Sequence, residues 1–361
     1  MSANFDLSNL ALQAVCPGNE ILYDDKGMPS IMVKIPKMSY ADLGLGDSTL
    51  VHPAFIVNGQ EVDAIYISKY QNIVQNGRAY SLPGQDPKHT INFDTARSNC
   101  EAKGEGWHLM TRAEWALLAL WCKKNGHQPY GNNNYGRDSR ETVYKAIPTS
   151  RDSSGKIQRV ATGTGPVTWS HDGTVAGIWD LNGNVYEWVG GLRTVYGEVQ
   201  VLVNNNAADS NHSQLATSTE WKAIDATTGD YITPNGSGTT ENSVKLDYVS
   251  NKITYSNTIT NQADTSRYHT FGTVTCDSTI SDEAKAVLYA LALLPYDSDA
   301  SKYEGDYMYI NNGAAERSFG CGGYWYSGAY NGVFYLYGYN TRASGGGNLG
   351  FRSAYVKLPT E

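Results

Sequence analysis

Cysteine is scarce in this chain, and no spacing typical of disulfides or metal sites accompanies it. The 361 residues include five cysteines, an odd number at wide intervals: Cys16, Cys100, Cys122, Cys276 and Cys321. This pattern argues against a disulfide framework and against a Cys-x-x-Cys zinc site. The seven histidines are equally scattered. We therefore expect reduced, mostly buried thiols and no metal.

Long apolar runs and basic clusters are missing as well. No stretch approaches the roughly 18 consecutive apolar residues of a membrane helix, so we expect no membrane insertion. The 28 basic residues face 36 acidic ones, and no run of Lys or Arg could follow a phosphate backbone, so nucleic acid is not an expected partner. Met1–Leu7 shows neither the basic cluster nor the apolar run of a secretory signal. Export by that route is not expected.

Glycine and tyrosine are abundant instead. The chain has 37 Gly, 26 Tyr and 8 Trp but only 7 Phe. A tyrosine ring supplies apolar contact area together with a hydroxyl. This composition suits a surface that must be both adhesive and soluble.

The hydrophobic pattern predicts many short strands. We expect strands over 31–36, 64–70, 199–203 and 252–255, and another over 53–57 that enters an Asn-Gly turn at 58–59. Long polar stretches rich in Gly, Asn and Ser separate them.

Helices are few, and one has an unambiguous start. Thr111 and Glu114 form a capping box, which opens an apolar run that ends in Lys123-Lys124 before Asn125-Gly126. Weaker signals predict helices over 94–103 and over 281–294, the latter capped by Ser281. Few helices, many short strands and much loop predict the α+β class.

One tract near the carboxyl end stands apart. Between 318 and 350 only Arg342 is charged, although the chain as a whole is 18% charged. Six tyrosines alternate there with small residues. Tyr, Ser, Gly and Asn are the residues with which antibody loops make contact, because they combine rigid amphipathic rings with adaptable hydrogen bonds.

The spacing within this tract predicts how its rings are arranged. In a strand, Tyr335, Tyr337 and Tyr339 would share one face, with Phe334 and Leu336 on the other. The rings could instead fill a core, but each buried hydroxyl would then need a hydrogen-bond partner. We expect the rings to point outward and to bind.

Four motifs in order resemble the formylglycine-generating-enzyme family, the sulfatase-modifying-factor type of the C-type lectin fold. They are Gly-Trp-His-Leu-Met-Thr-Arg-Ala-Glu-Trp at 106–115, Trp-Asp-Leu-Asn-Gly-Asn-Val-Tyr-Glu-Trp at 179–188, Gly-Gly-Tyr-Trp at 322–325 and Asn-Leu-Gly-Phe-Arg at 348–352.

The resemblance implies a C-type lectin-like domain with two main helices, short antiparallel strands and much irregular loop. We predict that this domain covers 28–195 and 303–361. We predict an N-terminal arm over 1–27 and an insertion or second lobe over 196–302.

Enzymes of that family carry a cysteine pair shortly after the Gly-Gly motif, which activates oxygen through copper. This chain has Tyr326, Ser327 and Tyr330 in that neighbourhood, and its nearby thiol, Cys321, comes before Gly322. Tyrosine cannot replace a thiolate as soft ligand and nucleophile. We therefore predict that the protein is not an enzyme and has no catalytic residues.

The tract also resembles the variable region of proteins diversified by retroelements, among them the tropism determinants of phages. Residues 322–352 match the pattern of that region at every fixed position, and none of Lys, Glu, Gln or Met occurs between 318 and 350. The resemblance implies that the ligand-contacting variable residues are Tyr324, Tyr326, Ser327, Ala329, Tyr330, Tyr335, Tyr337, Tyr339, Asn340, Ser344, Gly345 and Gly346. It implies that the scaffold of the site includes Trp325, Gly328, Phe334, Leu336, Arg342, Phe351 and Arg352.

A turn near the second motif offers oxygen ligands from Asp180, Asn182, Asn184 and Glu187. These could hold calcium, or they could bond the local backbone as Asx residues commonly do. We predict no cofactor and no metal, with calcium as the alternative.

Together these features favour a binding protein whose partner is a cell-surface protein or glycan receptor, encoded by a phage or prophage and diversified by a retroelement. Other phage tail or virion proteins are further expected partners, and the virion or the cytoplasm of the producing cell is the expected location. Two alternatives stay open: a formylglycine-generating-type oxidase, which would form an aldehyde on a Cys-containing peptide, and a bacterial surface adhesin.

Overall fold

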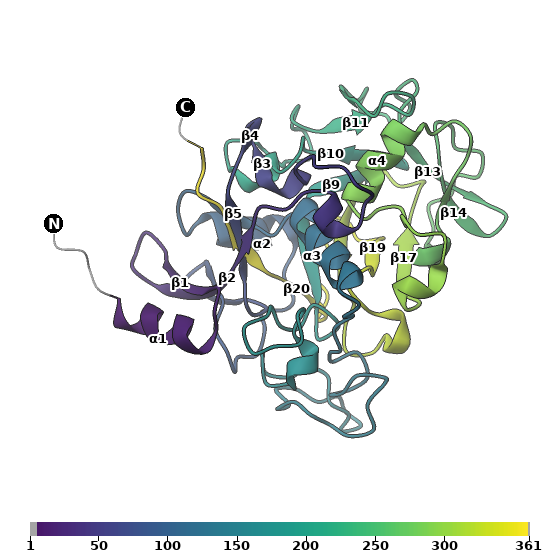
Figure 1. The fold of residues 1–361 in the computed structure, drawn as a ribbon. Coiled ribbons are helices and arrows are strands. Elements are labelled where there is room, and N and C mark those ends of the chain that lie inside the picture. Colours follow the sequence, from purple (N-terminus) through teal and green to yellow (C-terminus); the bar gives the residue numbers. More distant parts are fainter. Residues whose placement is uncertain (1–5, 360–361) are drawn as a thin grey trace.

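The structure is a computed structural model that describes residues 6–359 (Figure 1). Its smaller main sheet has five strands in the order β1 (Asn19–Tyr23), β2 (Pro29–Pro36), β5 (Ala64–Ser68), β21 (Ser353–Tyr355) and β8 (Trp107–Leu109). This sheet therefore contains strands from early and from late in the described chain, with β21, which follows the last predicted motif, paired between β5 and β8.

The larger sheet holds the tract. Its strands run in the order β15 (Arg267–Thr270), β17 (Tyr307–Ile310), β19 (Leu336–Gly338), β18 (Arg317–Cys321), β9 (Tyr186–Val195), β10 (Glu198–Val201), β13 (Lys245–Val249), β14 (Lys252–Ser256) and β16 (Thr275–Cys276). β11 (Lys222–Ile224) pairs with β10 and β12 (Tyr231–Ile232), and β20 (Leu349–Phe351) pairs with β9. Two hairpins, β3 (Ile56–Val57) with β4 (Gln60–Glu61) and β6 (Ile73–Gln75) with β7 (Arg78–Tyr80), complete the strands described.

Within the described residues there are four α-helices, three of them at the positions predicted from the sequence and one, near the amino end, that was not predicted. They are α1 (Leu7–Val15), α2 (Phe93–Glu101), α3 (Arg112–Lys124) and α4 (Asp282–Ala290). No helix among residues 6–359 has the length and apolarity needed to cross a membrane.

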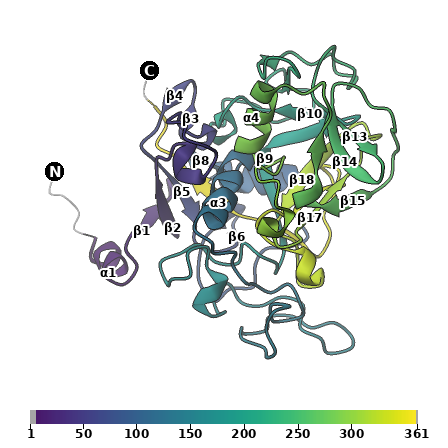
Figure 2. The same ribbon diagram turned by 45° about the vertical axis from the view of Figure 1, so that its right-hand side comes forward.

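The capping box of α3 is confirmed. The Thr111 hydroxyl accepts from the Glu114 amide at 3.2 Å, and the Glu114 carboxylate accepts from the Thr111 amide at 2.9 Å. Its apolar run is buried as predicted, with Trp115, Leu117 and Leu120 in the largest hydrophobic cluster. α3 therefore lies inside the molecule and packs on β9 (Figures 1 and 2).

Two predicted elements differ from the structure. α4 ends four residues before the predicted Leu294, and the Arg112 guanidinium donates to the carbonyls of Leu291 and Ala292 just beyond its end. Over 53–55 the chain forms a 3-10 turn where a strand was predicted, because the His52 side chain accepts from the Ala54 amide. The Asn-Gly turn at 58–59 is present between β3 and β4.

The segments expected to be an arm and an insertion both add strands to the sheets. β1 pairs with β2 over its whole length, and β10, β13, β14 and β16 continue the larger sheet beyond β9. In Figures 1 and 2, α1 and β1 lie at one side of the molecule, and β13 and β14 lie at the opposite side.

Candidate ligand-binding face

The tract starts and ends against the same strand. β18 runs antiparallel to β9, and β20 runs parallel to it. Between them, a loop with a 3-10 turn at Gly328–Tyr330 leads into β19, which pairs with β18 and β17. The irregular parts of the tract are therefore carried on a rigid sheet.

The alternation predicted for β19 is present. Phe334 and Leu336 belong to the main hydrophobic cluster. Tyr335 and Tyr337 lie in a second cluster with Tyr186, and the ring of Tyr339 contacts that of Tyr337 at 6.2 Å between centroids. The period of two thus separates core residues from tyrosines.

The prediction that all three of these tyrosines are exposed is wrong for Tyr335. This residue is 1% exposed, and its hydroxyl shares a 3.0 Å hydrogen bond with that of Tyr186. The ring of Tyr309, 5.8 Å away between centroids, covers it from β17. Tyr335 is part of the floor of the face and not of its contact surface, because alternation decides the side of a strand but not the depth.

The other predicted variable residues reach solvent at least in part. Tyr326, Tyr330 and Tyr339 are 59%, 50% and 38% exposed. Half-buried or exposed with them are Tyr324, Tyr337, Ser327, Ala329, Asn340, Ser344, Gly345 and Gly346. Their contact with a ligand stays a prediction.

The predicted scaffold residues are mostly inside. Trp325, Phe334, Leu336, Phe351 and Arg352 are buried, whereas Arg342 and Gly328 are half-buried.

Arg352 joins two of the motifs through a buried ion pair. It donates to both carboxylate oxygens of Glu187 at 2.8 Å and to the carbonyls of Ser68 and Trp179 at 2.7 and 2.8 Å.

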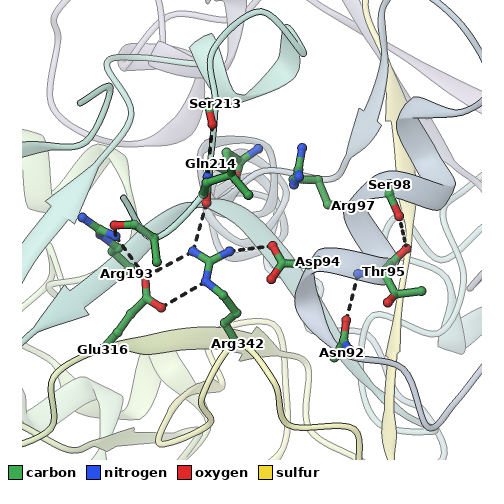
Figure 3. Close-up of polar contacts among 12 residues, drawn as sticks. Asn92, Asp94, Thr95, Arg97, Ser98, Arg193, Ser213, Gln214, Glu316 and Arg342 are labelled. Carbon is green, nitrogen blue, oxygen red and sulfur yellow. Dashed lines mark hydrogen bonds and ion pairs between the residues drawn. The ribbon is translucent and has the colours of Figure 1, made fainter. Parts of the chain in front are cut away.

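Arg342 fastens the far end of the tract to three other segments (Figure 3). Its guanidinium donates to Glu316 at 3.0 and 3.1 Å, to Asp94 on α2 at 2.6 Å and to the carbonyl of Gln214 at 2.9 Å. Glu316 also accepts from Arg193 on β9 at 2.9 Å. The one charged residue of the tract is therefore structural.

Two neighbouring strands bring tyrosines from outside the tract into the same face. Tyr268 on β15 lies opposite Tyr309 on β17, which is in register with Tyr337 on β19. Ring centroids are 5.0 Å apart between Tyr268 and Tyr309 and 5.1 Å between Tyr309 and Tyr337. Tyr307, also on β17, approaches Tyr330 of the tract to 4.1 Å.

Tyr268, Tyr307 and Tyr309 were not predicted to belong to the face, because they lie outside the tract. The alternation of Tyr307 and Tyr309 around Met308 is the signal that indicates two rings on one strand face. Nothing in the sequence indicates that β15 and β17 lie beside β19.

The face is uncharged at neutral pH. Burial raises the pKa of Tyr309 to about 12, and neighbouring tyrosines act in the same direction. Burial likewise raises the pKa of Tyr307, Tyr324 and Tyr337. The hydroxyls therefore keep their protons and can both donate and accept hydrogen bonds.

The cysteine nearest to the tract motif is not available as a thiolate. All five thiols are free, and Cys321 is fully buried. Burial raises the pKa of Cys321 to about 11, although Arg112, which donates to its sulfur at 3.2 Å, acts in the opposite direction. A thiol of this kind is a poor nucleophile and a poor metal ligand at neutral pH.

Most side-chain oxygen atoms of the turn before β9 bond to the protein, whereas Asp180 Oδ1 is buried without a hydrogen-bond partner among the described residues. Asn184 Oδ1 accepts from the Val160 amide at 3.0 Å, and Asp180 Oδ2 accepts from the Gly163 amide at 2.9 Å. Glu187 is engaged in the ion pair described above. Across residues 6–359 no cluster of three or more His, Cys, Asp or Glu side chains could hold a metal ion.

Comparison with known proteins gives one family and remote structural similarities. Residues 54–236, just over half of the chain, match the sulfatase-modifying factor enzyme 1-like domain. PvdO from Pseudomonas aeruginosa is 13% identical with a TM-score of 0.33, covering 94% of this chain and 98% of that one. Treponema denticola variable protein 1 is 13% identical with a TM-score of 0.34, covering 94% and 99%. No curated protein matches significantly.

Proposed function

The chain belongs to the sulfatase-modifying factor enzyme 1-like domain family, with its C-type lectin-like fold, and from this premise we propose that it is a diversified ligand-binding protein. Its tyrosine tract would recognise a cell-surface protein or glycan receptor.

The observation that carries the proposal is the separation of roles along the tract. Eleven of the twelve candidate variable residues reach solvent, while the aromatic and aliphatic scaffold residues between them are buried. Surface substitutions away from special features usually change stability by less than about 0.5 kcal/mol. Such a face can change its side chains and keep its fold.

Binding is favoured over oxidation by the state of Cys321. The oxidase chemistry of this family needs reactive thiols, and this thiol is buried with a raised pKa. An assay for aldehyde formation on a Cys-containing peptide tests the point, and we expect no product.

We further propose that a phage or prophage encodes the protein. It would be located on the virion, beside other tail proteins, or in the cytoplasm of the producing cell. Sequencing the surrounding DNA tests the retroelement. We expect a reverse-transcriptase gene and a near-copy of the segment that encodes residues 322–352, differing only at adenines. Differences at other bases would remove this part of the proposal.

The direct test of the face is a binding assay on immobilised bacterial cells and on a glycan array. A Tyr326→Ala/Tyr330→Ala/Tyr339→Ala variant should lose most of the binding that the native chain shows. Tyr23→Ala, which removes an exposed ring from the other sheet, is the matched control and should bind like the native chain. Equal binding by the triple variant would mean that these rings are not the contact.

A further inference from the structure

We propose that Tyr268, Tyr307 and Tyr309 are a permanent part of the recognition surface, and that the resulting composite face fits a flat, weakly charged protein epitope. This inference rests on the proposed function and deepens it. The three residues are called the tyrosine platform below.

The register of three strands aligns the platform with the tract. Tyr268, Tyr309 and Tyr337 form one row across the adjacent strands β15, β17 and β19. Neighbouring strands lie about 4.8 Å apart, and the ring centroids follow this spacing at 5.0 and 5.1 Å. A ligand seated on Tyr337 therefore meets the platform at the next strand.

The ring of Tyr268 is accessible to a partner. Tyr268 is 52% exposed, a fraction like that of Tyr330 in the tract. A ring that is half exposed contributes little hydrophobic stabilisation to the folded chain. Burying it against a partner would remove further apolar area from water and so favour binding. Tyr268 comes from the 196–302 segment, so this segment has a role at the rim of the site.

The residue at position 330 of the tract controls how much of the platform a partner can contact. The Tyr330 ring lies at 4.1 Å from that of Tyr307 and covers part of it. A small residue at position 330 would uncover Tyr307. Every variant of the tract thus presents either its own ring or the ring beneath it, and an aromatic contact is always available.

The kind of partner follows from shape and charge. Sites for small molecules are concave, whereas the five cavities described are lined by other residues. Uncharged surfaces rich in tyrosine are typical of the centres of protein interfaces, from which Asp, Glu and Lys are depleted. Charges flank the face. Lys156 is 4.8 Å from the ring of Tyr135, which lies 5.5 Å from the ring of Tyr326 between centroids. Arg317 is 5.7 Å from the ring of Tyr339.

The test uses the full chain displayed on cells, randomised at the eleven exposed tract positions, with lysozyme as the protein probe and chitohexaose as the sugar probe. Clones that bind lysozyme are then changed at the platform. We expect Tyr268→Ala to weaken binding at least tenfold across independent clones, as buried tyrosine anchors do. Tyr307→Ala should do the same in the clones that carry a small residue at position 330. Tyr268→Phe should keep most of the affinity, and Tyr23→Ala should change it less than twofold.

Thermal unfolding of each variant separates folding from recognition. Because Tyr268 is half exposed, Tyr268→Ala should melt like the parent clone.

The outcomes are distinguishable. If Tyr268→Ala and Tyr307→Ala leave lysozyme binding unchanged while reversion of the selected tract residues abolishes it, the platform proposal is wrong and the proposed function stands. If reversion of the tract also leaves binding unchanged, the proposed function is wrong. Clones that bind chitohexaose, with none for lysozyme, would overturn the assignment to protein partners.

Discussion

The motif frame around β9 holds the buried ion pair of Arg352 with Glu187, and the tyrosine face beside it includes Tyr309 and Tyr337. The two regions use their polar groups in opposite ways. In the frame, Arg352 and Glu187 are fully buried and each hydrogen bond is directional. On the face, neutral hydroxyls lie on rings that pack against other rings. Removing a buried charge partner is costly, whereas an exposed ring can be exchanged cheaply. The comparison shows that a buried ion pair and exposed rings whose exchange should cost little can lie on neighbouring strands of one sheet.

The largest effect should come from breaking the frame. We expect Arg352→Met to lower the free energy of unfolding by about 3–5 kcal/mol, because it leaves the Glu187 carboxylate buried without its partner. Urea denaturation measures this change. The double variant Arg352→Met/Glu187→Leu should recover part of the loss, and a further loss on adding Glu187→Leu would contradict the ion-pair explanation.

The next effect compares two tyrosines only four residues apart. Tyr335→Ala should cost about 3 kcal/mol, since it leaves a cavity and removes the partner of the Tyr186 hydroxyl. Tyr339→Ala, on an exposed ring, should cost less than about 0.5 kcal/mol. Thermal unfolding of both variants measures the contrast, and similar losses would show that Tyr335 is not the floor of the face.

A smaller effect involves Asp306, a buried carboxyl beneath the tract. Burial raises its pKa to about 8, although the Phe334 amide, which donates to it at 2.8 Å, acts in the opposite direction. Between about pH 4 and pH 8 the folded state therefore holds a proton that the unfolded state has released, so the stability that this proton contributes falls as the pH rises.

Asp306→Asn keeps an acceptor for the Phe334 amide and has no charge to bury. We expect it to be more stable than the native chain by about 2 kcal/mol at pH 8, a gain that shrinks toward pH 4. Urea denaturation at several pH values measures the difference. A gain that is constant over this pH range would rule out the buried proton as its cause.

The smallest effect should come from the exposed tract residues themselves. Tyr326→Ser and Ala329→Ser should each change the free energy of unfolding by less than about 0.5 kcal/mol, as measured by urea denaturation. A loss above about 1 kcal/mol at either position would mean that the loop depends on its side chains, and the contrast between frame and face would weaken.

Local signals allowed much of the fold to be predicted. Thr111 with Glu114 and Ser281 are caps that act within one turn, and the alternation in β19 is a property of any strand. Where a distant group intervenes, local reasoning fails: Arg112 takes the carbonyls just beyond α4, and the His52 side chain makes a turn where a strand was expected.

The family, the α+β class and the division of the tract into core and tyrosine positions could be determined from the sequence alone. This was possible because capping, alternation and motif spacing act over short distances along the chain. The depth of each ring could not be determined in this way. Tyr335 became floor and Tyr268 became rim through the pairing of β15, β17 and β19, strands that come from separate stretches of the chain. The burial of a side chain depends on which residues pack over it. Those neighbours come from distant parts of the sequence and are fixed only by the tertiary structure.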